Sequence, residues 1–530
     1  MTAVTGEVTV GGVAYPASAT VALPAPVPAP VRSQYEQPFT WDSPWNMPVS
    51  ANAVYAATGI AVTYDYSTEG YAVENNCTDP AQPVRNLTGS HDGTIAVHCD
   101  PAMTGTGQWN FTCAFLRTDG DAVAQAQTLQ LQAGGNPNIG GMGTYTVPDV
   151  SITASQGITG AHGGSSLSCL GGTLTKADLT GTGPIPHACK VLFNGLMFYS
   201  SKGPGWQWPA SNADGGYNQP GNVNYYGGSN PLIVEGALLA LPPSVSPLTR
   251  YADPLIRRIA TALQNYGCYI CDNTASGQGN ATAVIEMNWD AAPAFKGGPT
   301  FGADLLRMYE DLQVISNSTQ ATPGGGALGT RRLAPFAPPF AAAPKIGTIA
   351  DDFTANRLAT VWGGSAGVTW SAGQAAFKCD PGYDSWLQPP GAYDLTGSGI
   401  YARVSPYLAP GAATSILLGV STGNNVLFGY AGAALAVNRN IGGAQTTLFT
   451  TAYNATAHAW WRVREANGVT SFDSSPDGVA WTSQFSCADY VWGFPLASLD
   501  VTFQAGVYGG GPAGVSYVRA VNAGQPAPLT

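Results

Sequence analysis

The chain has 530 residues, more than one hydrophobic core can organise, because single cores stop growing near ~250–300 residues. Only 10% of the residues are charged, and 67 glycines and 40 prolines interrupt regular helices, so a mainly helical fold is excluded and short strands joined by turns are expected. The formal charge of −11 offers no positive surface to a phosphate backbone, which argues against nucleic acid as a partner.

The N-terminal residues, MTAVTGEVTVGGVAYP, contain neither a basic segment nor an unbroken apolar one. We therefore expect synthesis in the cytosol without a signal peptide. The most apolar run, PLIVEGALLALPP, is interrupted by Glu235 and ends in prolines, well short of the ~20 residues that a membrane helix needs. No membrane insertion is expected.

Residues 1–34 are predicted to form an extended arm. Two short β-like runs, GEVTVGGV and SATVALP, come before PAPVPAPV, whose alternating prolines favour an extended polyproline conformation. Such a segment cannot form a core of its own. We expect it to dock on a neighbouring protein.

Residues 35–320 are predicted to form a β-sandwich or barrel with short helices. Apolar runs such as GIAVTYDY and WNFTCAFLRT alternate with Gly, Asn, Asp and Pro, which is typical of strands joined by turns. In ADPLIRRIATALQNYG, Asp253 can cap a helix that Pro254 begins and Gly267 ends. An apolar stripe in GADLLRMYEDLQVI predicts a second helix, which closes the domain.

Residues 321–347 are rich in Gly and then in Pro and Ala, which predicts a linker that is flexible first and stiffer later. Strand-like alternation resumes in residues 348–530, which we predict to be a second β-sandwich. Within it, WWRVREANGVTSFDSSPDGVAWT predicts three antiparallel strands with turns at Asn467-Gly468 and at Pro476-Asp477-Gly478.

Residues 351–523 contain a recognisable set of features, namely Asp352-Phe353, Trp362, the strand Trp461-Arg462-Val463-Arg464-Glu465, and the turn Ser474-Ser475-Pro476-Asp477-Gly478 with Trp481. With these features the second domain resembles the concanavalin-like, lectin-like β-sandwich modules at the ends of tail proteins from phages of actinobacteria. Similar modules also occur in secreted glycan-binding proteins. The resemblance implies a β-sandwich over residues 348–530.

The first domain carries four other features, which are SPWN at 43–46, GAHGGSSLSCLGGTLTKADL with IPHACKV over 160–191, WPA at 208–210, and CDN at 271–273. With these features it resembles a jelly-roll family seen in secreted bacterial proteins and in actinobacteriophage minor tail proteins. The resemblance implies a jelly-roll fold for residues 35–320. It indicates where the protein comes from more than what reaction, if any, it catalyses.

Together the two resemblances imply a minor tail protein of a phage virion, located at the tail tip, that binds host cell-envelope glycan during adsorption. On this interpretation the arm binds other tail proteins, and the class favours a homo-oligomer such as a trimer. Two alternatives stay open. The chain could be a polysaccharide depolymerase, either a lyase or a glycosidase, or a purely architectural tail protein. Binding without catalysis is the preferred expectation.

Two of the five histidines, His162 and His187, are the candidate catalytic bases. The glycines of GAHGG let the backbone approach a ligand beside His162, and Asp272 or Asp214 could be its carboxylate partner. A hydrogen-bonded structural histidine is the alternative for each. The acids that could form a glycosidase pair are too dispersed for spacing to select two of them: Asp214, Glu235, Asp272 and Glu286.

A turn-rich stretch, residues 203–228, is the candidate glycan-binding surface, and we call it the aromatic stretch. Flat rings stack on the apolar faces of sugars, while short polar side chains bond their hydroxyls. The rings of this stretch are Trp206, Trp208, Tyr217, Tyr225 and Tyr226. The alternative is that Trp206 and Trp208 pack inward from a strand. In the second domain the candidates are Tyr383, Trp386 and Trp492.

No cofactor and no metal centre is predicted, but one turn could bind Ca²⁺. In DPGYDSW, Asp380 and Asp384 offer hard oxygen ligands, although a solvated turn is the alternative. The nine cysteines are scattered, and the pair Cys268 and Cys271 lacks the second pair or the nearby histidines of a zinc site. Buried thiols are expected.

Overall fold

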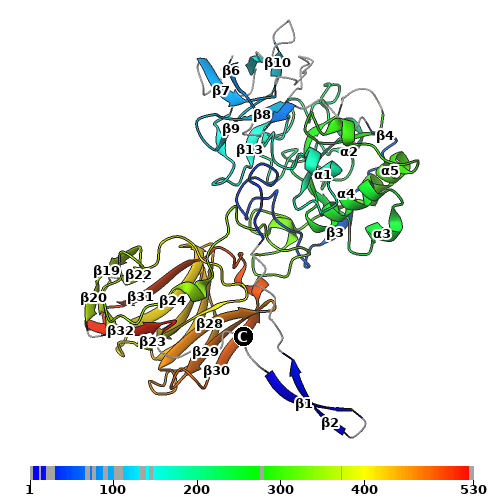
Figure 1. Ribbon diagram of the computed structural model, residues 1–530. Helices are drawn as coiled ribbons and strands as arrows, with labels where there is room; N and C mark the ends of the chain where they lie inside the picture. The colour runs from blue at the N-terminus through cyan, green and yellow to red at the C-terminus, as the bar shows by residue number, and fades with distance from the viewer. Residues whose placement is uncertain are drawn as a thin grey trace.

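The computed structural model describes residues 30–65, 72–74, 79–86, 93–100, 112–127, 129–131, 139–142, 147–274, 280–371, 373–382 and 384–523, together with two strands within residues 4–19. The chain is mainly β with a few short helices, which confirms the predicted fold class (Figure 1). Among the described residues, no helix is both long enough and apolar enough to cross a membrane.

The first part of the predicted arm is a β-hairpin, and residues 30–34 at its end are described as well but lie outside this hairpin. Strand β1 (Val4–Val10) pairs antiparallel with β2 (Val13–Ala19), and the two form a sheet of their own. The proline-rich run that follows, residues 20–29, lies outside the described residues.

A seven-stranded mixed sheet organises the first domain. Its strands, in spatial order, are β3 (Tyr55–Ala57), β18 (Gln313–Ile315), β15 (Leu238–Ala240), β16 (Cys268–Asn273), β14 (Cys189–Phe193), β17 (Thr282–Ile285) and β4 (Tyr64–Asp65). The two central strands, β14 and β16, are parallel, and both are buried along their whole length. Buried strands of this kind place any polar side chain they carry inside the domain.

Both predicted helices are present. Helix α4 (Pro254–Asn265) begins after Asp253, whose carboxylate accepts bonds from the N–H groups of Leu255 (2.9 Å) and Ile256 (3.2 Å). Helix α5 (Phe301–Asp311) buries Leu305 and Tyr309 against the same core. The shorter helices are α1 (Lys176–Thr180), α2 (Gly195–Phe198), α3 (Pro247–Arg250), η1 (Ala292–Ala294), η2 (Pro323–Gly325), η3 (Ile346–Thr348) and η4 (Asp489–Trp492).

Two four-stranded sheets complete the first domain, in the upper part of Figure 1. One contains β12 (Val150–Ser151), β9 (Ala122–Gln127), β8 (Thr112–Leu116) and β5 (Ala72–Glu74), and the other contains β10 (Leu129–Leu131), β11 (Ile139–Met142), β6 (Ala81–Asn86) and β7 (Gly93–His98). Strand β13 (Thr159–His162) lies against β8 and β9. It carries the GAHGG motif toward the central sheet.

The second domain is a sandwich of two seven-stranded antiparallel sheets. The first contains β19 (Gly364–Ala366), β22 (Asp384–Gln388), β31 (Asp500–Val507), β24 (Ala412–Ser421), β25 (Asn424–Ala431), β26 (Ala434–Ile441) and β27 (Ala444–Ala452). The second contains β20 (Val368–Ser371), β21 (Gln374–Cys379), β32 (Gly514–Val521), β23 (Gly399–Ser405), β28 (Trp460–Ala466), β29 (Val469–Ser475) and β30 (Thr482–Ala488). Strands β28, β29 and β30 are the predicted antiparallel meander.

The prediction of a flexible linker needs correction for the first half of residues 321–347. The guanidinium of Arg332 is buried and donates to the carbonyl oxygens of Pro48 (3.0 Å), Pro323 (2.6 Å) and Gly326 (2.8 Å). Later in the segment, Lys345 forms an ion pair with Asp394 of the second domain at 2.5 Å. The connection is therefore bound to both domains, because its arginine and lysine find partners that composition alone does not reveal.

Candidate functional site

Three acidic side chains from separate parts of the first domain meet at the end of β16. Asp272 lies in β16, Glu235 lies just before β15, and Asp214 lies in the aromatic stretch. Their carboxylate oxygens lie within 4.8 Å of one another. We call these three residues the acidic cluster. The fold thus brings together three of the four dispersed acids, while the fourth, Glu286, lies beside His162.

Backbone pairing holds the aromatic stretch beside Glu235. The N–H of Gln207 donates to the carbonyl of Glu235 (2.8 Å), and the N–H of Glu235 donates to the carbonyl of Gly205 (3.2 Å). This pairing places Asp214 and Tyr226 where they can reach the buried Glu235 side chain.

The hydroxyl of Tyr226 bridges two of the acids. Its oxygen lies 2.6 Å from Oε1 of Glu235 and 3.0 Å from Oδ2 of Asp214, and the side-chain amide of Asn273 donates to the same Asp214 oxygen at 2.6 Å. A phenol has one proton to donate, so it can donate to only one of the two carboxyl groups. For both contacts to be hydrogen bonds, one carboxyl group must itself carry a proton.

The burial of the three acids also favours a protonated carboxyl group in the cluster. Glu235 is fully buried, Asp272 is 5% exposed and Asp214 is half-buried. Burial, followed by the charges of Asp214 and Asp272, raises the pKa of Glu235 well above its ordinary value, and burial also raises the pKa of Asp214. The cluster therefore holds less than three full negative charges at neutral pH.

Two glycines of the GAHGG motif make room for the acids. A Cβ on Gly163 would lie 1.9 Å from Oδ2 of Asp272, and one on Gly164 would lie 2.7 Å from Oε1 of Glu235. Gly163 also has φ of +48°, which favours glycine. The motif does permit close approach of the backbone, as predicted, but the groups that approach it here are the carboxylates.

The rings of the aromatic stretch divide into an inner and an outer set. Tyr226 is fully buried, so the prediction that its ring stacks openly on a ligand is wrong, and its hydroxyl belongs to the acidic cluster instead. The ring of Tyr217 lies against that of Tyr226, with centroids 5.6 Å apart, and its hydroxyl donates to the carbonyl of Gly203. Trp206 packs partly against two cores, while Trp208 and Tyr225 are half-buried.

His162 lies inside the domain and does not contact a ligand surface. Its Nε2 is 3.6 Å from Oε2 of Glu286 and 3.9 Å from Sγ of Cys271, and the residue is fully buried. Burial, followed by the charge of Lys190, lowers the pKa of His162 well below its ordinary value. The predicted pairing with Asp272 or Asp214 is therefore replaced by a contact with Glu286, and a catalytic base in contact with substrate is not what this geometry provides.

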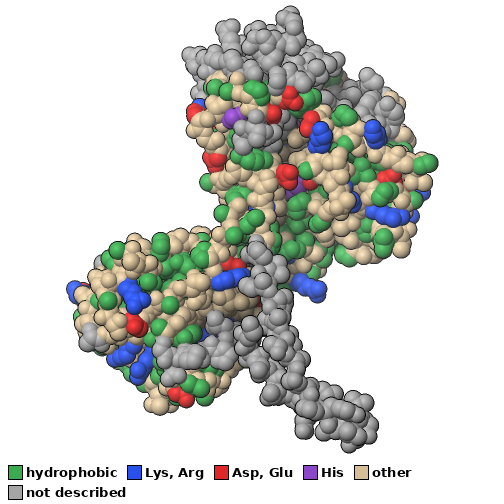
Figure 2. All heavy atoms as spheres, in the orientation of Figure 1, with side chains coloured by type: hydrophobic (Ala, Val, Ile, Leu, Met, Phe, Trp, Pro, Cys, Tyr) green, Lys and Arg blue, Asp and Glu red, His purple; other side chains and the backbone are tan. Residues whose placement is uncertain are grey.

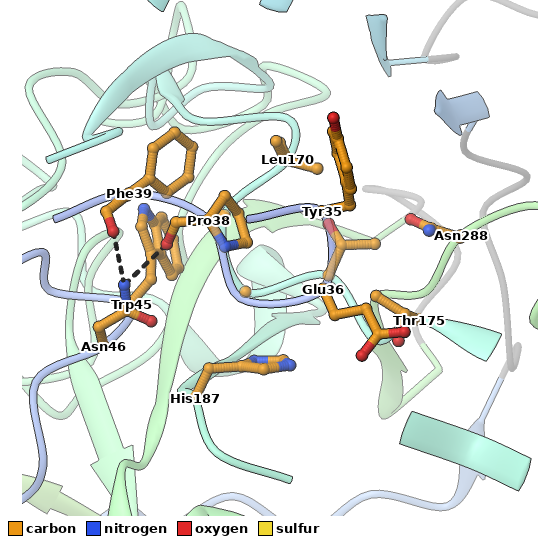
Figure 3. A pocket seen from close by; sticks show the side chains of 13 residues that line it. Tyr35, Glu36, Pro38, Phe39, Trp45, Asn46, Leu170, Thr175, His187 and Asn288 are labelled. Atoms are coloured by element: carbon orange, nitrogen blue, oxygen red, sulfur yellow. Dashed lines mark hydrogen bonds between the residues drawn. The ribbon is translucent and has the colours of Figure 1, made fainter. Parts of the chain in front are cut away.

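Both ring nitrogens of His187 also contact groups inside the domain. Its Nδ1 lies 2.9 Å from the carbonyl of Ala188 and its Nε2 lies 3.2 Å from Oδ2 of Asp178. The hollow beside it, lined by Tyr35, Glu36 and Asn288 among others, has a volume of about 20 Å³ (Figure 3). A space of that size accommodates about one water molecule and no sugar ring. The catalytic prediction for His187 is therefore not supported by the geometry.

The cysteines at 268 and 271 belong to different cores. Side chains three residues apart on one strand point to opposite faces, and Cys268 packs in the core beneath α4 while Cys271 faces His162. Both thiols are buried and free, as expected, and burial raises both pKa values well above the ordinary value. The pair cannot act as a two-thiol metal ligand.

The glycan-binding candidates of the second domain differ in their exposure. Trp492 is 1% exposed, with its ring stacked on Phe472 and edge-on to Phe494, so the prediction that it binds glycan is wrong. Trp386 is half-buried in β22, and Tyr383 lies outside the described residues.

An open groove of about 640 Å³, lined in part by Leu408 and Tyr453, was not predicted, because its lining residues come from four separate loops and strands.

The turn predicted to bind Ca²⁺ has its acids engaged elsewhere. Oδ2 of Asp380 pairs with Nζ of Lys378 at 2.5 Å, and Oδ1 of Asp384 accepts a bond from the hydroxyl of Tyr508 at 2.5 Å. Among the described residues, two groups of His, Cys, Asp or Glu are close enough to share a metal ion, and both lie in the first domain. One is the acidic cluster, and the other is His162 with Cys271 and Glu286.

Comparison with known proteins finds no matching family model and no matching curated protein. Among solved structures the chain is similar to a Crh5 transglycosylase in complex with NAG (13% identity, 34% of this chain, 86% of that chain, TM-score 0.28). It is also similar to a glycosyl hydrolase family protein from Mycobacterium fortuitum (17%, 33%, 97%, 0.26) and a laminarinase from Flavobacterium sp. UMI-01 (8%, 32%, 96%, 0.27). With TM-scores this low, no function is carried over from these proteins.

Proposed function

We propose that the chain binds a glycan of a host cell envelope through the outer rings of the aromatic stretch and the solvent-facing side of Asp214. One observation supports the proposal most directly. The aromatic stretch is hydrogen-bonded through its backbone to Glu235, and it carries the half-buried rings of Trp208 and Tyr225. The same stretch carries Asp214, whose carboxylate accepts a hydrogen bond from the buried Asn273. Partly exposed rings in one segment with a hydrogen-bonding carboxylate suit the apolar faces and the hydroxyls of a sugar.

The setting we propose is a phage virion, in which the protein is a minor tail protein at the tail tip. Support comes from the resemblance of both domains to actinobacteriophage tail modules. The separate β1–β2 hairpin is consistent with an arm that docks on another tail protein, and oligomerisation as a trimer would multiply weak glycan contacts. Gold-labelled antibody against the protein tests the setting, since label away from the tail of intact particles contradicts it.

Binding is tested with purified full-length protein and isolated host envelope glycan. We expect Trp208→Ala and Tyr225→Ala each to weaken binding about tenfold or more, because one stacked ring contributes ~1–2 kcal/mol. The matched control is Tyr490→Ala, which removes an exposed ring from the second domain. Equal losses in all three variants, or no loss in any, would contradict the assignment of the site.

The same incubation detects the alternative, in which the site cleaves the glycan. A protonated carboxyl group at neutral pH is the group that a glycosidase uses as its acid. New reducing or unsaturated ends that disappear in Asp214→Asn would make the chain a depolymerase. Intact glycan that stays bound supports binding alone, and absence of binding by the wild-type protein leaves the architectural alternative.

A further inference from the structure

Two members of the acidic cluster, Asp214 and Glu235, have no positively charged partner among the described side chains. Within the described part of the chain, no Lys, Arg or His forms an ion pair or hydrogen bond with Asp214 or Glu235, and the charges acting on Glu235 are those of the other two acids. Carboxylates withdrawn from water require a counter-charge, which is either a proton or a cation. Asp214 and Glu235 thus obtain no counter-charge from a described side chain, so either a proton or a bound cation must supply it.

Two buried oxygens beside the acids strengthen this conclusion, and one of them is not acidic. Oε2 of Glu235 has no hydrogen-bond partner among the described residues, and neither has the side-chain oxygen of Asn273. Asn273 is 8% exposed, and its amide nitrogen bonds Asp214 at 2.6 Å, which sets its oxygen at the edge of the cluster. Both unpartnered atoms are acceptors, so a ligand here must be a cation or a donor.

The kind and number of oxygen ligands favour one cation over another. Ca²⁺ takes six to eight oxygen ligands from carboxylates and amide carbonyls in a flexible geometry, whereas Mg²⁺ demands a near-ideal octahedron and usually keeps several waters with only one or two carboxylates. Three carboxylates gathered beside an amide oxygen therefore suit Ca²⁺ better than Mg²⁺. Gly163 and Gly164 let the carboxylates come together against the backbone, because a Cβ at either position would overlap Asp272 or Glu235. Asp214 is partly exposed, whereas Glu235 and Asp272 are buried.

We infer that Asp214, Glu235 and Asp272, with the amide oxygen of Asn273, form a binding site for a divalent cation of the size of Ca²⁺. The ion would displace the shared proton, supply the counter-charge in its place, and be bound by oxygen atoms from four side chains, with water completing its shell. It would also fix the aromatic stretch to β16 through Asp214. Any effect of the ion on glycan affinity rests on the proposed function, whereas the cation site itself does not.

The rival cluster, His162 with Cys271 and Glu286, does not support a similar inference. The ammonium of Lys190 is buried with it, donates to the carbonyls of Ser168 (3.0 Å) and Cys169 (2.8 Å), and interacts electrostatically with Glu286. Lys190 and Glu286 balance each other without a metal. A divalent ion added there would leave excess positive charge in the interior.

The test uses full-length protein freed of metal with a chelator and titrated with Tb³⁺, whose emission is excited through nearby Tyr and Trp rings. We expect the Tb³⁺ emission to saturate. Ca²⁺ should reduce this emission by half at ~10⁻⁴–10⁻³ M, the range of weak sites, whereas Mg²⁺ at the same concentration should have little effect. Asp214→Asn and Glu235→Gln should each weaken Ca²⁺ competition at least tenfold. The control, Asp384→Asn in the second domain, should not.

Absence of saturable emission from the wild-type protein would overturn the inference, as would its loss in Asp384→Asn with retention in Asp214→Asn. Melting curves of each variant show whether it is folded, and the preference of the wild-type protein for Ca²⁺ over Mg²⁺ tests the site without any variant. Glycan binding measured with and without the chelator separates the two proposals. Tb³⁺ binding without glycan binding contradicts the proposed function alone.

Discussion

Asp489 is a surface acid whose environment makes the second domain sensitive to pH. Burial, joined by the charge of Glu465, raises the pKa of Asp489 to about 6, although the hydroxyl of Thr470 bonds its Oδ1 at 2.8 Å. Because the folded-state pKa exceeds the unfolded value, the group contributes stability that is complete below about pH 4 and is lost as pH rises through 6.

We therefore expect the Tm of the second domain to fall by ~2–4 °C more in the wild-type protein than in Asp489→Asn between pH 4 and pH 8. This corresponds to about 1 kcal/mol after allowance for the solvent-exposed part of the side chain. Calorimetry at a series of pH values measures it. Parallel pH profiles for the two proteins would show that Asp489 titrates normally.

The composition of the aromatic stretch could be recognised from the sequence, because its rings and turn residues lie within one short segment, residues 203–228. The acidic cluster was not, because Asp214, Glu235 and Asp272 belong to three segments that only the fold brings together. Trp492 and Tyr226 were misjudged for a related reason: a large ring in a short polar segment can point either way, and neighbouring strands decide its direction.

The β28–β29 hairpin shows how a local signal determines an element. Asn467 and Gly468 both have positive φ, +55° and +80°, which is the backbone that a two-residue hairpin turn requires. We expect Gly468→Ala to lower the free energy of unfolding by about 1 kcal/mol, because an L side chain is strained there.

Urea unfolding measures this change, with Gly183→Ala as the control. Gly183 does not have a positive φ, and no atom lies within 4 Å of the position of its missing Cβ, so its substitution should change stability by less than ~0.5 kcal/mol. Equal effects at the two glycines would contradict the explanation from backbone strain.

Helix α4 was predictable for the same reason as the hairpin, because its start and stop signals are local: Asp253 and Pro254 directly precede and begin the helix, and Gly267 follows its end. The central sheet of the first domain was not predictable in detail. Its order pairs strands from distant parts of the chain, such as β18 with β3 and β17 with β4, and short buried strands carry no signal for their partners. The jelly-roll expectation thus indicated the class of fold but not the parallel pair at its centre.

Over the whole molecule, the two domains are joined by packed side chains. Trp41 from the first domain lies against the core of the second and meets Phe336 edge-on at 5.3 Å. The guanidinium of Arg32 donates to the carbonyls of Pro338 (2.6 Å) and Phe39 (2.5 Å), and a groove of about 670 Å³ lies along this junction. Figure 2 shows charged side chains scattered over the visible face, without a continuous basic patch.

We propose that the first domain holds the glycan, through the aromatic stretch and the acidic cluster. Hydrogen exchange of the full-length protein, measured with and without saturating host envelope glycan, tests it across the chain at once. We expect slower exchange in residues 203–228 and 160–166, which surround the cluster, and unchanged exchange in the core strands of the second domain. Slower exchange confined to residues 351–523 would contradict the claim.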